Sequence, residues 1–295
     1  MTMSNLCVVG LRRSGSTIFW ETFRQDSRLV AFDEPFNANL DELPAENIKN
    51  TRAEFIDVYS ADPAAFRDRF APILPESELD PSVTRKQSDY LKWLMDRERP
   101  VVVDLVRVNF KLDALSESLG DARVLHLHRS PIAWASSHLL PSGKGTWKRR
   151  YANAWRRASF WHRRGFYNSW HYEEIIGRMV GGPDGRWLET IGLPVSEFAR
   201  LPAYGRLMAF WYLAYRTVEE SGRKCFGSRF SSVRLEDFCA DPRTVTDGVY
   251  RQLGAAPADL DFSRVHRAAD GHRPRSRRWV ALAKKIGIPE ELLVR

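Results

Sequence analysis

The chain has 295 residues, of which 43% are hydrophobic, and its formal net charge is +8. This length and apolar content suit one large α/β domain or two smaller ones, each with a substantial core. No apolar run is long enough to span a membrane, and the N-terminus lacks the segments of a signal peptide, so we expect a cytoplasmic protein. The positive charge suits a polyanionic partner: a nucleotide, a sulfated or phosphorylated substrate, nucleic acid or a membrane surface.

The cysteines argue against two further classes of protein. Cys7, Cys225 and Cys239 are widely spaced and form no CxxC pair. Neither a disulfide framework nor a zinc site is therefore expected, and no other cluster of metal ligands is visible. Cys7 falls within an apolar run and is expected to be a small core residue.

The first predicted elements are a strand at 6–9, a loop at 10–17 and a helix over 18–23. The loop sequence, GLRRSGST, keeps the glycine spacing of the phosphate-binding loop GxxxxGK[ST], but Ser16 replaces the lysine. Glycines let backbone N–H groups point inward, and the start of the helix offers unpaired N–H groups to an anion. Arg13 adds a fork of donors that suits phosphate oxygens. We interpret the loop as a phosphate cradle; an ordinary strand–helix turn with serine caps is the alternative.

The rest of the chain alternates strands with helices. Further strands are predicted at 29–32, 101–106, 123–127 and 230–235, and helices at 204–220 and 241–253. This alternation indicates a three-layer α/β/α fold with a central, mostly parallel sheet. The proline-rich segment at about 40–90 is interpreted as helices and loops inserted above the sheet. Ligands of such folds bind at the carboxyl ends of the strands, where the loop lies.

A second segment of interest follows the strand at 123–127. Arg129 lies at the carboxyl end of that strand, and Ser130 can cap a helix that has Pro131 at its first position. Ser137 falls about two turns into this helix. Taken alone, the segment is better explained as a surface arginine and a helix serine.

Taken together, the two segments resemble the sulfotransferases that use 3′-phosphoadenosine 5′-phosphosulfate. Residues 13–17 match the family's RSGS[ST] loop, with Arg13 as the basic residue. Arg129, Pro131 and Ser137 match the family's Arg-x-Pro motif with a serine eight positions after the arginine. A third segment, 235–242, resembles the family's YED-x-x-x-DP stretch, which leads into a late helix. The three motifs cover most of the chain from residue 5 to 255.

The resemblance implies a single sulfotransferase domain over 1–295, with helical insertions at about 40–90 and 140–215 that form the acceptor cleft. The chain differs from many cytosolic members of this family at two positions. Ile18 stands where they carry an adenine-stacking tryptophan, and Leu235 stands where they carry a tyrosine. The arginine-type loop and the segment 33–36 look more like the carbohydrate-type branch. The residues expected to bind the cofactor are Arg12, Arg13, Ser14, Gly15, Ser16 and Thr17 at the 5′-phosphosulfate, Arg129 and Ser137 at the 3′-phosphate, and Arg275 and Ser276 in the C-terminal loop. A solvated basic stretch is the alternative for that last pair.

The chemistry implied is an in-line transfer that depends on positioning and needs no metal. Arg13 and the loop N–H groups would stabilise the negative charge that develops on the departing phosphate. Glu34 is the first candidate for the base that takes the acceptor's proton, and His128 is the second, although a core histidine is the better interpretation there. Asp104 and Arg107, with Glu34, are candidates for contact with the acceptor; Asp104 could equally be a buried cap.

Two other functions stay open. A kinase or NTPase with a phosphate-binding loop would need a lysine before Thr17 and a magnesium-binding aspartate. A non-enzymatic basic module would bind RNA or a membrane surface with steep salt dependence, although no nucleic-acid motif is present. The segment 147–170 repeats aromatics and arginines at helical spacing, which indicates either a helix packed on the core or a lid over the acceptor. The acceptor is expected to be a small molecule or a carbohydrate.

Overall fold

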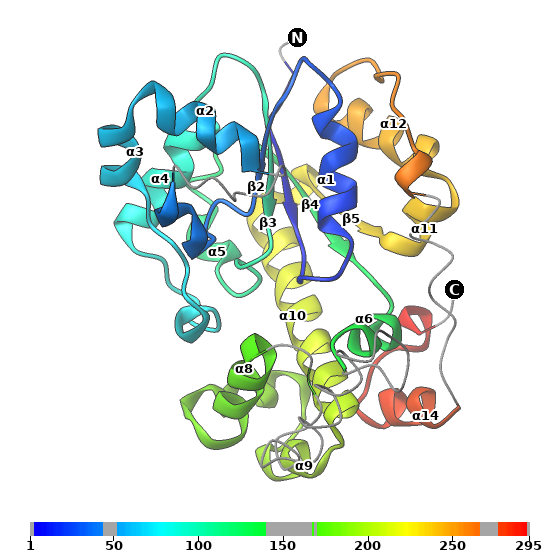
Figure 1. Cartoon of the computed structure of the whole chain (residues 1–295). Coiled ribbons are helices and arrows are strands. Elements are labelled where there is room, and N and C mark those ends of the chain that lie inside the picture. Colours follow the sequence, from blue (N-terminus) through cyan, green and yellow to red (C-terminus); the bar gives the residue numbers. More distant parts are fainter. Residues whose placement is uncertain (1–2, 44–51, 140–166, 168–169, 266–276, 294–295) are drawn as a thin grey trace, which may run out of the picture. The chain divides into compact units, whose positions relative to one another are not determined.

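The computed structural model describes residues 3–43, 52–139, 167, 170–265 and 277–293 (Figure 1). The chain divides into two compact units. The first consists of residues 1–129 and 215–271, and the second of residues 130–214 and 272–295.

The first unit is built on a five-stranded sheet in which every strand pairing is parallel. Its strands lie in the order β2-β3-β1-β4-β5, so β1 is central. All the strands predicted from the sequence are present, with ends within about two residues. The strands are β1 (Leu6–Val9), β2 (Val30–Asp33), β3 (Val101–Leu105), β4 (Arg123–His128) and β5 (Phe230–Arg234). The loop at 10–15 therefore leaves the middle strand at the carboxyl edge of the sheet.

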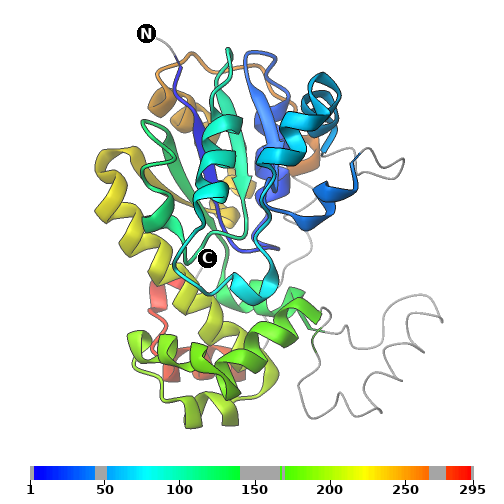
Figure 2. The same ribbon diagram turned by 90° about the vertical axis from the view of Figure 1, so that its left-hand side faces the viewer.

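Helices cover both faces of this sheet, which confirms the three-layer α/β/α prediction (Figures 1 and 2). Successive β1 residues alternate between two cores because strand side chains point to opposite faces: Leu6 and Val8 belong to one core, Cys7 and Val9 to the other. Cys7 is thus the core residue that the sequence predicted. The first face carries α1 (Ser16–Arg24), α11 (Leu235–Ala240) and α12 (Pro242–Leu253). The second carries α2 (Ala53–Ala61), α3 (Pro63–Arg69), α4 (Arg85–Met95), α5 (Leu112–Leu115) and the later part of α10 (Ala203–Phe226).

The segment at 40–90 is helical as predicted, but its helices form a layer against the sheet face. Aromatic side chains of α2, α3 and α4 are buried in the same core as β1 and β2. The longest of these helices has 11 residues, so the apolar period is too short to stand out in the sequence. The buried aromatics are Phe55, Tyr59, Phe66, Phe70 and Tyr90. Short 3₁₀ turns lie at Ala38–Glu42, Pro75–Ser77 and Gly227–Arg229.

The second unit is mainly helical over the residues that the structure describes, with one isolated antiparallel bridge between Leu139 and Tyr167. An aromatic cluster of Trp134, His138, Tyr172 and Phe210 joins α6, α8 and α10. Apart from Tyr167 and Trp170, the segment 147–170 lies outside the described residues. The elements are α6 (Pro131–Ser137), α8 (Trp170–Gly181), a 3₁₀ segment (Pro183–Ile191), α9 (Val195–Arg200), the first part of α10, α14 (Arg277–Lys285) and a 3₁₀ turn (Glu290–Leu292). None of the helices in the described ranges is long and apolar enough to cross a membrane.

Gly10 allows the loop to leave β1 close against β4, and replacing it tests this approach. A Cβ atom at Gly10 would lie 2.4 Å from the carbonyl oxygen of Leu127, which is backbone and cannot turn away. Gly10→Ala should therefore lower the free energy of unfolding by about 1–3 kcal/mol, measured by urea unfolding.

The matched control is Gly248→Ala, within α12. The nearest atom to a Cβ there is Arg251 Nη2, at 3.8 Å. Alanine favours a helix interior over glycine by about 0.5–1 kcal/mol, so this variant should be the more stable. Equal stabilities of the two variants would contradict the close approach of the loop to β4.

Candidate active site

The loop after β1 has the geometry of an anion cradle. Its turn is closed by a hydrogen bond from Ser14 N to Leu11 O, of 2.9 Å. Gly15 precedes α1 with a positive φ of 88°, and α1 begins at Ser16. The strand–loop–helix prediction is confirmed. Backbone N–H groups at the start of this nine-residue helix face the end of the sheet where an anion would be held.

Two residues of this edge have a backbone conformation that only glycine adopts easily. Among the described residues, Arg13 and Glu34 are the only non-glycine residues with positive φ, at 73° and 48°. They follow β1 and β2 at the carboxyl edge of the sheet. Left-handed backbone costs about 1–2 kcal/mol per residue, and it persists where the surroundings impose it, as they do at functional sites. The two outliers are the arginine and the glutamate that the sequence predicted to be catalytic.

One residue of the second motif, Arg129, and one of the third, Leu235, reach this loop. Arg129, which follows β4, donates from Nη1 to the carbonyl oxygen of Arg13 at 3.1 Å. A Cβ at Gly15 would lie 2.4 Å from Leu235 Cδ1, so the first turn of α11 packs directly on the loop. Glu236, the next residue of α11, is close enough to Arg129 to interact with its charge. Segments more than 100 residues apart thus converge on one turn.

Arg129 has hydrogen-bonding capacity left over. The residue is 5% exposed, and its Nε and Nη2 groups are buried without a hydrogen-bond partner among the described residues. Burial lowers the pKa of Arg129 to about 10, with Glu236 opposing the shift, so the side chain is still a cation at pH 7. A buried cation with unmade hydrogen bonds is costly. These two groups therefore fit an anion that joins them from outside the protein.

Glu34 is held at one carboxylate oxygen. Its Oε2 accepts a hydrogen bond from Asn37 Nδ2 at 2.5 Å and one from Arg52 Nη2 at 3.2 Å. None of the described residues donates a hydrogen bond to Oε1, and the side chain is 16% exposed. The sequence analysis identified neither partner. Asn37 lies in the turn that follows Glu34, whereas Arg52 arrives from the start of α2 with no local signal.

Asp104 lies in register with Asp33, on the neighbouring strand. It is completely buried, and neither carboxyl oxygen has a hydrogen-bond partner in the described structure. Burial raises the pKa of Asp104 well above its usual value, as do the charges of Asp33 and Glu34, while the Ser16 hydroxyl opposes the shift. Burial and the neighbouring carboxylates therefore favour the protonated, neutral form of Asp104. It has no surface open to an acceptor in this conformation.

Arg107, the other predicted acceptor contact, is also buried. Its Nη1 lies 3.7 Å from Glu78 Oε2, and the residue is 8% exposed. Its Nε group is buried without a hydrogen-bond partner among the described residues. Part of the guanidinium is thus committed to Glu78.

The ring of His128 packs against other aromatic rings. It contacts those of His126 and Tyr215, with centroid distances of 5.4 and 5.0 Å, on the α10 side of β4. Burial and the neighbouring His126 lower the pKa of His128 to about 3. The ring is neutral at pH 7 and a weak proton acceptor, as expected of a core histidine.

The remaining predicted residues divide into three groups. In the loop, Ser14 and Ser16 are buried, Arg12 is half-buried, and Arg13 and Thr17 are exposed. Ser137 ends α6 in the second unit and donates from Oγ to Trp134 O at 2.6 Å; Ser130 precedes that helix without the predicted side-chain cap. Arg275 and Ser276 lie outside the described residues. The described residues also contain no group of three or more His, Cys, Asp or Glu side chains placed to hold a metal ion.

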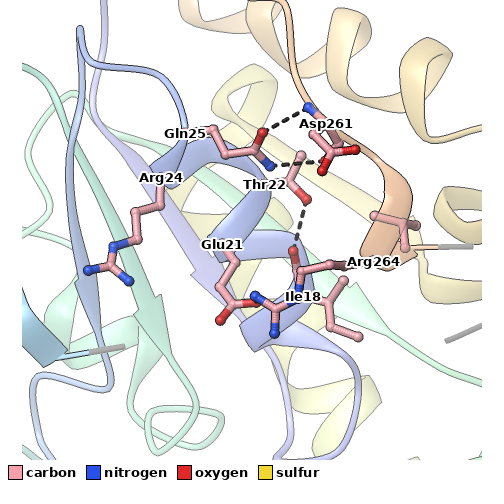
Figure 3. Close-up of a pocket in the computed structure, with 8 residues that line it drawn as sticks. Ile18, Glu21, Thr22, Arg24, Gln25, Asp261 and Arg264 are labelled. Carbon is pink, nitrogen blue, oxygen red and sulfur yellow. Dashed lines mark hydrogen bonds and ion pairs between the residues drawn. The ribbon is translucent and has the colours of Figure 1, made fainter. Parts of the chain in front are cut away.

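A cavity of about 440 Å³ begins where the loop ends (Figure 3). It lies between α1 and the segment 261–265. Two sets of contacts connect these walls: Arg264 Nη1 lies 2.7 Å from Glu21 Oε2, and Gln25 exchanges two hydrogen bonds with the backbone of Asp261. The cavity is lined by Ile18, Glu21, Thr22, Arg24, Gln25, Asp261, Arg264 and Val265.

Comparison with known proteins finds likeness only to solved structures. No family model matches the chain, and no curated protein matches it. The sulfotransferase domain of the Synechococcus PCC 7002 olefin synthase is 15% identical, with a TM-score of 0.45 over 97% of this chain and 96% of that one. The sulfotransferase domain from the curacin biosynthetic pathway is 15% identical, with a TM-score of 0.46 over 99% and 90%. A sulfotransferase from Alicyclobacillus acidocaldarius is 12% identical, with a TM-score of 0.43 over 99% and 96%.

The buried Asp104 generates a prediction about stability and pH. Because its pKa is raised in the folded chain, the stability that it contributes is fully present below about pH 3.9, its unfolded pKa, and is lost as the pH rises. Asp104→Asn keeps the neutral shape without this loss. The variant should be more stable than the parent at pH 8, with the difference shrinking toward pH 4, as measured by urea unfolding across that range.

Asp113→Asn serves as the control of opposite sign. A hydrogen bond from Lys224 lowers the pKa of Asp113, so its contribution is present at pH 8 and is lost as the pH falls. This variant should be no more stable than the parent at pH 8. If Asp104→Asn behaves in the same way, Asp104 is ionised in the folded chain.

Proposed function

We propose that this protein is a sulfotransferase that moves a sulfuryl group from 3′-phosphoadenosine 5′-phosphosulfate to a hydroxyl group of a small-molecule or carbohydrate acceptor. An amine is a less suitable acceptor. One observation carries the proposal: the backbone strain among the described non-glycine residues is confined to Arg13 and Glu34, a cation and a carboxylate at the same edge of the sheet. These are the two charges that such a transfer requires, one for the leaving phosphate and one for the acceptor's proton.

The residues around the loop fit an anionic donor. The N–H groups at the start of α1, the hydroxyl of Thr17 and the exposed side chain of Arg13 would hold the phosphosulfate. Arg129 has two buried N–H groups without partners and would bind a second anionic group of the donor. Ser137, Arg275 and Ser276 are further proposed contacts on the basis of the sequence resemblance alone.

The cavity beside Ile18 is the proposed place for the adenine. Ile18 follows directly on the last loop residue, so a base connected to the bound phosphates can reach this cavity. Ile18 supplies an apolar surface, and Glu21 and Arg264 supply polar groups at the walls. Val265 adds a second apolar side chain, and the other six lining residues are polar or charged, which suits the ring nitrogens and amino group of an adenine.

The transfer would form one bond to sulfur while it breaks another. When bound, the donor supplies the sulfuryl group. Glu34 takes the proton of the acceptor hydroxyl as the acceptor oxygen bonds to sulfur and the bond from sulfur to the phosphate oxygen breaks. Arg13 and the loop N–H groups stabilise the charge left on the phosphate. Glu34 is preferred to His128 as the base because the low pKa of His128 makes it a weak proton acceptor.

A kinase or NTPase is the second candidate, and one observation favours it. Asp104 is the penultimate residue of β3, the strand next to β1, where an enzyme of that class needs an aspartate for magnesium. However, this carboxyl group is completely buried and its pKa is raised well above normal, so it is poorly suited to a metal ion. Ser16 also replaces the lysine of that loop.

Ligand-induced stabilisation distinguishes the candidates. Adenosine 3′,5′-bisphosphate should raise the melting temperature, since a ligand at 100 times its Kd stabilises by about 2.7 kcal/mol. ATP with Mg²⁺ should raise it less. No shift with millimolar bisphosphate, or a larger one with ATP and Mg²⁺, would overturn the proposed function; shifts that any polyanion reproduces would indicate a general basic surface.

Arg13→Gly adds a variant in which binding and stability change in different directions. Glycine adopts positive φ freely, so the unliganded variant should melt no lower than the parent. Its stabilisation by the bisphosphate should be largely lost. If the variant keeps this stabilisation, the cation that binds the cofactor is a residue other than Arg13.

Glu34→Gln separates binding from turnover. The amide keeps the shape of the side chain but takes up no proton, so kcat for sulfate transfer should fall about 10²–10⁴-fold, the usual contribution of a positioned base. Stabilisation by the bisphosphate should stay at the parent value. Full activity of this variant would mean that another group is the base.

A further inference from the structure

On the basis of the proposed function, we propose that Arg52 is a positioning residue for Glu34: with Asn37 it holds Oε2, so that Oε1 is presented to the acceptor hydroxyl. Both donors bond the same carboxylate oxygen, Oε2.

Arg52 is built into the protein rather than lying on its surface. Its side chain is 6% exposed, although it immediately precedes α2. Nη2 lies 3.2 Å from Glu34 Oε2, while Nε lies 3.9 Å from Asp33 Oδ2. The guanidinium therefore stands beside two consecutive carboxylates at the end of β2. An arginine suits this position because its fork of donors can address two groups from one fixed plane.

Asn37 restricts Glu34 from a second direction. Its Oδ1 accepts a hydrogen bond from the backbone N–H of Asn39 at 3.1 Å, which leaves Nδ2 to face Glu34. The backbone N–H of Asn37 also bonds to Glu34 O at 3.0 Å, closing the turn. Glu34 N in turn donates to Asp104 O at 3.1 Å. The side chain, the backbone N–H group and the backbone carbonyl group of Glu34 are thus all hydrogen-bonded.

Such fixation matters because the backbone of Glu34 is in a strained conformation. With φ at 48°, the residue would relax if its contacts were removed, and the carboxylate would move with it. Misplacement of a reacting group by about 1 Å costs about 10²-fold in rate. Loss of a contact at Oε2 should therefore be seen in kcat.

The removal of all charge at position 52 is a poor test. Asp33 and Glu34 would lose a buried partner, and an unpaired buried charge can prevent folding. Arg52→Lys keeps the charge but cannot reproduce the planar fork. Asn37→Ala removes the other donor without changing any charge.

The test is a double-mutant cycle on purified full-length protein with a sulfate acceptor found by screening. Arg52→Lys and Asn37→Ala should each lower kcat, by about 10–100-fold for the former, with stabilisation by adenosine 3′,5′-bisphosphate unchanged. Combined with Glu34→Gln, Arg52→Lys should cause no further loss, because a positioning residue acts only through its target. The control is Arg28→Lys, at an arginine that bonds the buried carboxylate of Asp26 at 2.7 Å; its kcat should match the parent.

The outcomes separate this inference from the proposed function. Parent protein that transfers no sulfuryl group would overturn both. Parent protein that transfers it, while Arg52→Lys keeps full kcat or lowers kcat equally with and without Glu34→Gln, would overturn the role of Arg52 alone. A fall in bisphosphate binding with Arg52→Lys would likewise assign this residue to the cofactor rather than to Glu34.

Discussion

The hydrogen bond from Arg129 to the carbonyl oxygen of Arg13 connects the ends of two neighbouring strands, and the site depends on it. It joins the residue after β4 to the loop after β1, across a separation of 116 residues. The guanidinium that makes this bond is buried and keeps two donors unused. The same side chain can therefore hold the turn through one hydrogen bond and bind an anion through its two other N–H groups. Leu235 packs on the adjacent Gly15, so the loop is enclosed by segments that reach it from the two later motifs.

At the carboxyl ends of β2 and β3, several acidic side chains lie close together. Asp33, Glu34 and Asp104 bring three acidic groups to the ends of adjacent strands. Two features reduce the negative charge: burial raises the pKa of Asp104 and so favours its neutral form, and Arg52 lies beside the other two carboxylates. Neutralising the deepest group avoids a second buried cation. It also leaves Glu34 as the partly exposed carboxylate of the set, which is the property that a proton acceptor requires.

Much of the fold could be predicted from the sequence because its signals are local. Apolar runs of four to six residues indicated the strands, and the glycine spacing indicated the loop. The motif spacing also selected Arg13 and Arg129, and the place of Glu34 after the second predicted strand selected that residue; the structure finds all three at the carboxyl edge of the sheet. Arg52 and Asn37 could not be found in this way: a lone arginine in a proline-rich segment gives no sign that it folds back onto residue 34. The packing of α2–α4 was also missed, since helices of 7–11 residues are too short for a clear apolar period.

The left-handed backbone at Arg13 and Glu34 has a consequence for what each side chain must supply in return. Glycine would relieve the steric conflict at either position. At position 34 it would also remove the partner of Asn37 and of the buried Arg52. The conformational cost of about 1–2 kcal/mol at Glu34 is therefore opposed by contacts that glycine cannot make.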